Sequence, residues 1–383
     1  QLVGVKERPE FLDLNPFGMV YIPAGHYLMG AGDQDVPYAL THQSKNVTVV
    51  ALWMDETEIT NNEYRQFVYW VRDSIAHCLL GDAEITDEEK YGHYLKYDKN
   101  SEYEGEVIEP KLINWKEEIP WDSQNEEVVA ALSPLFTQTN TRFYHYRPNA
   151  LNVGMLNYEY WTYDLSNFKD PKDPDNYGAA VKESEGSDLG GLYANRPSHF
   201  NNGYERFFRR DVVNIYPDTL CWNHDFTYSM NDPMTLNYFS HPQFDHYPVV
   251  GVNWNQAKAF CVWRTEKLNK YLKAQKGEAV LSEFRLPTEA EWEWAARGGN
   301  HLNPYPWGGP YTRNENGCFL ANFKPLRGNY VADGGLRTLI VGHYPPNDWG
   351  LYDMAGNVAE WTNSAFDPLS YNYTWDMNPN YTY

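Results

Sequence analysis

The stretch RLPTEAEWEWAARGG, from Arg285 to Gly299, contains the clearest helix signal in the chain. Its Thr288 hydroxyl can accept a hydrogen bond from the backbone amide of Glu291, while the Glu291 carboxylate reaches back to Thr288. The glycines at its end predict the stop of the helix. Two further blocks rich in tryptophan and glycine follow, YPWG at Tyr305–Gly308 and GLYDMAGNVAEW at Gly350–Trp361. The order and spacing of the three blocks indicate one specific fold.

One strand and two more helices are predicted upstream of these blocks. Met19–Gly30 alternates apolar with small or polar residues and predicts an early strand that breaks at glycine. Thr60–Glu63 is a second capping signal, and apolar residues at helical spacing follow it as far as a stop at Gly81. Asn253–Gln256 is a weaker cap of the same kind, for a helix that ends at Gly277. We expect all three helices to be short and most of the remaining chain to be loops.

The chain is strongly acidic, with 52 Asp and Glu against 31 Lys and Arg and a net charge of −21. Such a surface repels phosphate backbones and anionic headgroups, which argues against nucleic acid as a partner and against electrostatic docking to membranes. Hydrophobic residues make up 42% of the chain, enough for a substantial core. No apolar run reaches about 18 residues, so no transmembrane helix is predicted. The opening QLVGVKERPE has no apolar signal region.

The composition changes between Arg72 and His246. This region contains two acidic stretches, a turn-rich segment and aromatic clusters, at Gly81–Lys90, Glu102–Glu109, Asp170–Gly191, Arg142–Pro148 (RFYHYRP) and Tyr158–Leu165 (YEYWTYDL). The aromatic residues are too numerous for a solvated linker, so we predict a folded insertion at about residues 73–245. Exposed clusters would form a protein-binding face, whereas buried clusters would pack against the core. The sequence leaves both alternatives open.

The blocks resemble the formylglycine-generating-enzyme superfamily, whose members are also called sulfatase-modifying factors. The resemblance covers Met19–Gly30, Leu52–Phe67 (LWMDETEITNNEYRQF) and His246–Trp263 (HYPVVGVNWNQAKAFCVW), and from there it runs nearly unbroken to Asp367. It implies an irregular, coil-rich α+β fold related to C-type lectins. It also implies a single domain over residues 19–383, with the C-terminal end of the family domain missing.

Within this superfamily, three strings resemble the gliding-motility-associated lipoprotein K family, known as PorK or GldK. They are Asp33–Leu40 (DQDVPYAL), Met54–Ile75 (MDETEITNNEYRQFVYWVRDSI) and Asp225–Val252. The resemblance implies a lipoprotein on the periplasmic face of the outer membrane and a component of the type IX secretion system. Residues 1–18 would be an extension after a removed lipoprotein signal. The expected partners are copies of itself and PorN (GldN) in a large ring, and possible further partners are other outer-membrane secretion components.

The cysteines bear on whether the resemblance extends to catalysis. Oxidising members of the superfamily bind copper(I) through a cysteine pair near the C-terminus, because copper(I) prefers soft thiolate ligands. Four widely spaced cysteines do not match that position: Cys78, Cys221, Cys261 and Cys318. The chain stops at Tyr383 before reaching it. Cys261 matches a structural cysteine of the family, whereas Ala296 replaces the second one. The resemblance therefore implies a pseudoenzyme without catalytic residues and without copper.

The residues alone leave the state of these cysteines open. Four cysteines without a CxxC pair do not make a disulfide framework, so they are thiols or form at most one bridge. Cys221 and His224 stand three residues apart, but a zinc site needs three or four ligands.

The resemblance also implies two structural calcium sites. One would use the carboxylates and carbonyls of Asp353, Gly356, Val358 and Glu360. The other would use the side chains and carbonyls of Asn322, Phe323, Asp333 and Gly335. Calcium takes carboxylate and carbonyl oxygens, and a glycine-bearing loop can turn several carbonyls inward. Alternatively, the carboxylates satisfy backbone amides in a tight loop, as Asp often does.

Two other functions remain as alternatives to a non-catalytic ring subunit. One is a copper-dependent oxidase that generates formylglycine. The other is a lectin-like module with a ligand pocket lined by Trp254, Trp292 or Trp361. The chain has no GxSxG, HExxH, P-loop or GxGxxG motif that would indicate another enzyme class. If the protein is a ring subunit, we expect its interfaces in the region from Arg72 to His246 and in the N-terminal segment.

Overall fold

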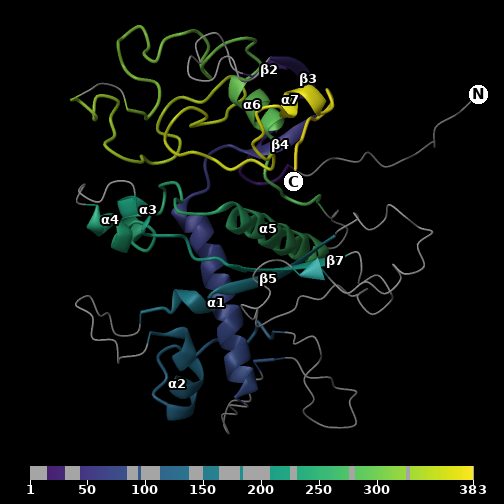
Figure 1. Ribbon diagram of the computed structural model, residues 1–383. Coiled ribbons are helices and arrows are strands. Elements are labelled where there is room, and N and C mark those ends of the chain that lie inside the picture. The colour runs from purple at the N-terminus through teal and green to yellow at the C-terminus, as the bar shows by residue number, and fades with distance from the viewer. Residues whose placement is uncertain are drawn as a thin grey trace, which may run out of the picture. The chain divides into compact units, whose positions relative to one another are not determined.

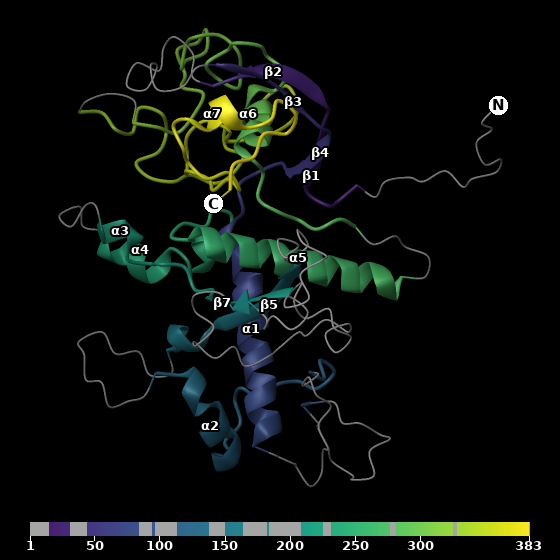
Figure 2. The same ribbon diagram turned by 45° about the vertical axis from the view of Figure 1, so that its right-hand side comes forward.

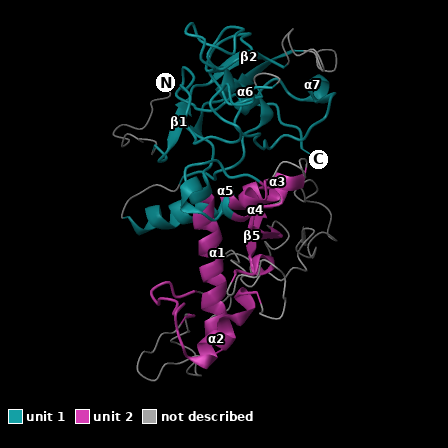
Figure 3. Ribbon diagram, turned by 90° about the vertical axis from the view of Figure 1, so that its left-hand side faces the viewer, with its two compact units in different colours: residues 1–62, 237–250, 261–383 teal, residues 63–236, 251–260 magenta. Residues whose placement is uncertain are grey.

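The computed structural model describes residues 15–30, 44–83, 94–95, 113–137, 150–163, 182–183, 208–224, 231–275, 281–324 and 328–382. The chain divides into two compact units, which are described separately. Unit 1 comprises residues 1–62, 237–250 and 261–383, and unit 2 comprises residues 63–236 and 251–260 (Figure 3). Several sequence features lie outside the described residues: the string at 33–40, most of the acidic stretches, the turn-rich segment and the RFYHYRP cluster.

Unit 1 contains two antiparallel strand pairs. Strand β1 (Met19–Ile22) pairs with β4 (Leu52–Asp55), and β2 (Gly25–Met29) pairs with β3 (Lys45–Val49) (Figures 1 and 2). The predicted strand at Met19–Gly30 is therefore two strands, separated by Pro23 and Ala24. Proline has no amide hydrogen to donate to a ladder, which favours a break at this point.

Helix α6 (Glu289–Arg297) forms as the sequence predicts. Thr288 Oγ1 accepts from the Glu291 amide at 3.2 Å, and Glu291 Oε2 accepts from the Thr288 amide at 2.8 Å. Gly298 ends the helix with φ at 57°, a left-handed conformation that glycine adopts without steric cost. The capping box and the glycine stop are therefore both confirmed.

The core of unit 1 forms between α6 and the strand pair β2 and β3. Trp294 stacks on Tyr27 with ring centroids 5.3 Å apart and meets Trp349 edge to face at 4.8 Å. A Cβ atom on Gly25 would lie 2.3 Å from the Trp294 ring, so only glycine fits there. Around these rings the core consists of small and aliphatic side chains: Ile22, Met29, Val47, Val49, Ala290, Ala295 and Leu351.

Helices α1 (Asn61–Asp82) and α5 (Trp254–Ala274) have 22 and 21 residues, so the expectation of short helices is wrong for both. The predicted stop at Gly81 is correct to within one residue, because α1 ends at Asp82, and Gly81 is also a packing position. Gly81 lies inside α1, and a Cβ atom there would come within 2.5 Å of the Leu95 side chain. The weaker cap of α5 is confirmed, because Asn253 and Gln256 exchange hydrogen bonds of 2.8 and 2.9 Å.

Unit 2 is built on a three-stranded sheet in the order β5 (Asn157–Tyr163), β7 (Phe208–Asn214) and β6 (Lys182–Glu183). The β5–β7 pair is antiparallel, and β6 runs parallel to β7. Tyr158 of β5 meets Phe67 of α1 at 5.2 Å, and Phe67 meets Phe260 at 5.9 Å. The described part of the YEYWTYDL cluster thus buries Tyr158 and Tyr160 in the core.

The remaining elements are short. The helices are α2 (Glu126–Leu132), α3 (Cys221–His224), α4 (Asp232–Asn237) and α7 (Ser370–Tyr373), and single 3₁₀ turns cover Ser133–Leu135, Val153–Met155 and Pro242–Phe244. Helix α2 lies beside α1 in both views (Figures 1 and 2). Among the described helices, none combines the length and apolar character needed to cross a membrane.

Candidate metal centre

The loop from Asp353 to Glu360 lies in unit 1 and has an unusual backbone. Asp353 and Asn357 have φ values of 53° and 57°, and Gly356 has φ at 93°. Non-glycine residues at positive φ are uncommon and persist only where the surroundings hold them. Here Asp353 Oδ2 accepts from the Gly342 amide at 2.6 Å, and Glu360 Oε2 accepts from the Trp292 indole at 2.6 Å.

The two predicted calcium loops contact each other directly. A Cβ atom on Gly356 would lie 2.2 Å from the carbonyl oxygen of Asn322. That oxygen accepts from the Asn357 amide at 2.9 Å, and Asn322 Nδ2 donates to Asn357 Oδ1 at 3.0 Å. Residues that the sequence assigns to two separate sites therefore form one packed loop pair.

The second predicted ligand set is also brought together, around Asp333. Asp333 is buried, and its carboxylate accepts from the amides of Phe323 at 2.8 Å and Gly335 at 3.3 Å. Each of its two oxygens thus takes one backbone amide. This geometry matches the alternative in which an aspartate holds a tight loop. It makes the Asp333 set the weaker calcium candidate of the two.

The loop has a further carboxylate that the sequence does not single out, the buried Glu58 from the segment that follows β4. Its Oε2 accepts from Asn357 Nδ2 at 2.6 Å, and its Oε1 accepts from the Val358 amide at 3.1 Å. Glu58 is 7% exposed. The sequence offers no signal for this role, because Asp55 and Glu56 are equally acidic neighbours and the partner Asn357 is 299 residues away.

The carboxylates around this loop carry poorly compensated charge. Burial, together with the nearby Asp353 and Glu360 carboxylates, raises the pKa of Glu58 to about 8, although hydrogen bonds from Asn357 and Val358 oppose the shift. Burial also raises the pKa of Asp353, although the Gly342 amide and His343 oppose it. Desolvation raises the pKa of the Glu360 carboxyl, and the nearby Asp353 adds to the shift, whereas the hydrogen bond from Trp292 opposes it. A bound cation would offset this repulsion.

The donor chemistry of the Asp353–Glu360 loop fits calcium. Its two carboxylates and two carbonyls are all oxygen donors, the class that calcium prefers. In the described part of the chain, no three His, Cys, Asp or Glu side chains converge as a metal-binding group. The loop would use only two side chains and take its other ligands from the backbone. If calcium binds, Asp353, Gly356, Val358 and Glu360 would hold it and fix the turn.

The four cysteines all lie in described segments and form no disulfide with one another. Cys78 is buried in α1 and Cys221 lies in α3, both in unit 2, whereas Cys261 of α5 and the exposed Cys318 belong to unit 1. Partial burial and the nearby Asp218 raise the pKa of the Cys221 thiol, which disfavours the thiolate that zinc requires. Cys221 and His224 gain no third ligand among the described residues.

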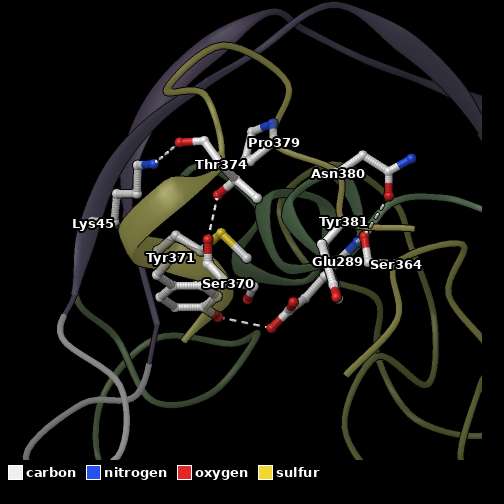
Figure 4. Close-up of a pocket in the computed structure, with 10 residues that line it drawn as sticks. Lys45, Glu289, Ser364, Ser370, Tyr371, Thr374, Pro379, Asn380 and Tyr381 are labelled. Carbon is white, nitrogen blue, oxygen red and sulfur yellow. Dashed lines mark hydrogen bonds between the residues drawn. The ribbon is translucent and has the colours of Figure 1, made fainter. Parts of the chain in front are cut away.

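The three tryptophans named for a lectin-like pocket are divided between the two units. Trp254 belongs to unit 2, whereas Trp292 and the half-exposed Trp361 belong to unit 1. A small pocket in unit 1 is lined by other residues, among them Lys45, Glu289 and Tyr371 (Figure 4). Lys45 donates to the Thr374 carbonyl and Tyr371 donates to Glu289, so these polar groups already serve the scaffold.

Comparison with known proteins places this scaffold in a family. The sequence profile of the sulfatase-modifying factor enzyme 1-like domain matches residues 7–131 and 200–381, which is more than half of the chain. The chain therefore belongs to the formylglycine-generating-enzyme, or sulfatase-modifying factor, family. The stretch that this match leaves out, residues 132–199, is narrower than the predicted insertion at about 73–245. The boundaries of that insertion remain a prediction.

The similar proteins include both active and inactive family members by name. The inactive C-alpha-formylglycine-generating enzyme 2 of Bos taurus is 40% identical over 121 residues, which is 31% of this chain and 34% of that protein. The formylglycine-generating enzyme of Streptomyces coelicolor is 38% identical over 127 residues, which is 33% of this chain and 35% of the enzyme. The chain thus matches about a third of the length of these relatives.

A solved structure is also similar in part. The structure of PvdO from Pseudomonas aeruginosa is 27% identical and covers 36% of this chain and 46% of that chain, with a TM-score of 0.28.

Proposed function

We propose that this protein is a non-catalytic structural subunit of the periplasmic ring of the type IX secretion and gliding machinery. It would assemble with itself and with PorN (GldN), next to other outer-membrane secretion components. Its place would be the periplasmic face of the outer membrane, held by a lipid anchor. The proposal is supported by the strings that resemble the lipoprotein K family, of which VYWVRDSI (Val68–Ile75) forms the middle of α1. The acidic surface supports an anchor of this kind, because it offers little electrostatic attraction to anionic headgroups.

The observation that carries the non-catalytic part is the similarity to proteins named inactive C-alpha-formylglycine-generating enzyme 2, from Bos taurus and Mus musculus. The oxidising members of the family bind one copper(I) ion through a pair of cysteine thiolates, the soft ligands that copper(I) prefers. The four cysteines lie on α1, α3, α5 and a loop, and none of them matches the family's copper-binding position, so none of them is proposed as a copper ligand. The carboxylates that would otherwise be candidates for chemistry are engaged in loops and caps of the scaffold. Calcium at the Asp353–Glu360 loop would serve the same structural purpose.

The oxidase remains the second candidate, because similar proteins such as the Streptomyces coelicolor relative are named formylglycine-generating enzymes. The test is direct. The purified chain is incubated with copper(I), oxygen and a sulfatase-type peptide that contains one cysteine, and mass spectrometry follows the peptide. The Streptomyces coelicolor enzyme serves as the positive control. We expect no conversion by this chain, and formylglycine in the product would overturn the non-catalytic assignment.

A further inference from the structure

Unit 2 has an exposed aromatic surface that the scaffold does not use for its core. The segment from Ile113 to Ser123 lies across one side of α1. Its Trp115 ring stacks on Trp70 of α1 with centroids 5.4 Å apart and an interplanar angle of 20°. Further along, the Trp121 ring lies 4.6 Å from the guanidinium carbon of Arg72. We call this surface the Trp115–Trp121 face, and it comprises Tyr69, Trp115, Glu118, Trp121 and Asp122.

The aromatic side chains of this face are open to solvent although their backbone is fixed. Trp115 is 42% exposed, Trp121 37% and Tyr69 44%. Beneath them, the buried ring of His77 joins the segment to α1, with Nδ1 2.8 Å from the Asp73 carbonyl and Nε2 3.1 Å from the Glu117 carbonyl. Rigid, half-exposed tryptophans are typical of the residues that contribute most to protein interfaces, because they bring large contact area at a small cost in entropy.

The charge around these rings is predominantly negative. Residues 113–133 contain five acidic side chains and one basic one, Lys116; the acidic ones are Glu117, Glu118, Asp122, Glu126 and Glu127. Glu118 and Asp122 are exposed beside the two tryptophans. A complementary surface would therefore present lysine or arginine. A second copy of the same chain is a poor match, because each copy carries a net charge of −21.

The chain contains its own example of how this face binds a cation. The Arg72 guanidinium lies between two rings, 4.7 Å from the Tyr69 centroid and 4.6 Å from the Trp121 centroid. It also pairs with the Asp73 carboxylate at 2.7 Å. An arginine of a partner can use the same chemistry, since Trp115 and Trp121 are partly exposed and Glu118 and Asp122 are exposed in the same segment.

We propose that the Trp115–Trp121 face docks an arginine- and lysine-bearing surface of a partner protein. Cations of the partner stack on Trp115 and Trp121 and pair with Glu118 and Asp122. The inference rests on the proposed function for the identity of that partner, which is PorN. It specifies where PorN binds and which chemistry PorN must present there.

The experiment compares two sets of variants of the full chain by isothermal titration with PorN. The first set is Trp121→Ala and the double charge reversal Glu118→Lys with Asp122→Lys, which changes only exposed side chains. The matched control is Glu283→Lys with Glu315→Lys, two exposed carboxylates of unit 1 that give the same change in net charge. We expect each face variant to bind PorN about tenfold more weakly or worse, which is the usual effect of losing an interface tryptophan or a complementary charge pair. The control variant should bind like the unchanged chain.

A second probe separates this inference from the proposed function. A peptide of alternating arginine and glycine is titrated into the same proteins, with tryptophan fluorescence as the readout. If PorN binds all variants equally, the face is not the docking site and the inference fails while the proposed function stands. If PorN binds none of the proteins, the proposed function fails. The peptide titration then tests on its own whether the Trp115–Trp121 face binds arginine side chains. Peptide binding that weakens only in the face variants supports the inference, and equal binding overturns it. Self-association that depends on the face would identify a second copy as its occupant and would also overturn it.

Discussion

Tryptophan has opposite roles in the two units. In unit 1, Trp294 is 6% exposed and is enclosed by Tyr27 and Trp349, so its burial helps to define the family scaffold. In unit 2, Trp115 and Trp121 keep more than a third of their surface in water. The same residue type therefore builds a core in one unit and lies half-exposed at the surface of the other. If the proposed docking is correct, the family fold takes on an assembly role without a change in its core.

The carboxylates show the same contrast. In unit 1, Glu291 and Glu58 are buried and bind backbone amides of α6 and of the Asp353–Glu360 loop. In unit 2, Glu118 and Asp122 are exposed beside the tryptophans. Unit 2 also has an internal pair, Glu159 with Arg210 at 2.9 Å, so the contrast concerns the Trp115–Trp121 face and not the unit as a whole.

The largest expected effect comes from truncating the two classes of tryptophan. Trp294→Ala should lower the free energy of unfolding by about 3–5 kcal/mol, because it leaves a cavity between α6 and the β2–β3 pair. Trp121→Ala should lower it by about 1 kcal/mol or less, because that side chain is already partly in water. Urea unfolding followed by circular dichroism measures both. Equal losses in the two variants would remove the distinction between core and surface tryptophans.

A glycine substitution tests the contact between the two calcium loops. In Gly356→Ala the new methyl group would lie 2.2 Å from the Asn322 carbonyl oxygen. The backbone must then move, and we expect a loss of about 3 kcal/mol. The control is Gly309→Ala, where φ is also positive but no atom lies within 4 Å of the added carbon. That variant should lose only about 1 kcal/mol from backbone strain. If thermal unfolding shows similar losses for both, the close packing of Gly356 on Asn322 is incorrect.

Calcium should stabilise unit 1 through the Asp353–Glu360 loop. A single site adds about 2.7 kcal/mol to the free energy of unfolding when free calcium is a hundredfold above its dissociation constant. Differential scanning calorimetry with calcium and with a chelator gives the shift in Tm. Asp353→Asn should abolish the shift, whereas Asp376→Asn, with the same change in charge at an exposed position, should keep it. A calcium response that survives Asp353→Asn would exclude this loop as the site.

The smallest effect concerns the ion pair of Arg285 with Glu291, whose two contacts are both 2.7 Å. Burial would raise the pKa of Glu291, but hydrogen bonds from Arg285 and Thr288 outweigh it and lower the pKa. A lowered pKa in the folded state stabilises the protein above the unfolded value, about 4.3, and this contribution is lost as the pH falls through and below that value. Arg285→Met should cost about 1 kcal/mol at pH 7, a small value because Arg285 is half exposed.

The measurement for this pair is urea unfolding of both proteins at pH 7 and at about pH 3, below the unfolded pKa of glutamate. The difference between Arg285→Met and the unchanged chain should shrink at the lower pH. A difference that stays constant would show that Arg285 stabilises α6 by packing rather than by holding the Glu291 carboxylate ionised.

Local signals in the sequence predict much of the fold. The capping box and stop of α6, and the starts of α1 and α5, depend on residues three or four positions apart, so the sequence shows them directly. The end of α1 is predicted to within one residue by Gly81, whereas the packing of Gly81 on the Leu95 side chain is not visible in the sequence. Helices α1 and α5 are longer than expected, because packing within the units stabilises turns that local signals do not support.

The candidate metal centre was predictable only in part. The family resemblance names the residues of the two loops. The structure brings Asp333 to the amides of Phe323 and Gly335 and places Asp353 close enough to Glu360 for their charges to interact. Their contact through Gly356 and Asn322, and the support from Glu58, depend on residues far apart in the chain. The sequence likewise leaves open which aromatic clusters are exposed. The structure places Tyr158 and Tyr160 in the core, because the pairing of β5 with β7 turns these tyrosines toward α1. Trp115 and Trp121 lie at the surface.

The central claim is that this family scaffold serves assembly. Size-exclusion chromatography with light scattering, on the full chain alone and mixed with PorN, tests it most directly. The account predicts an assembly in the mixture that contains many copies of both proteins. A chain that elutes as a monomer at every ratio and concentration of PorN would contradict it.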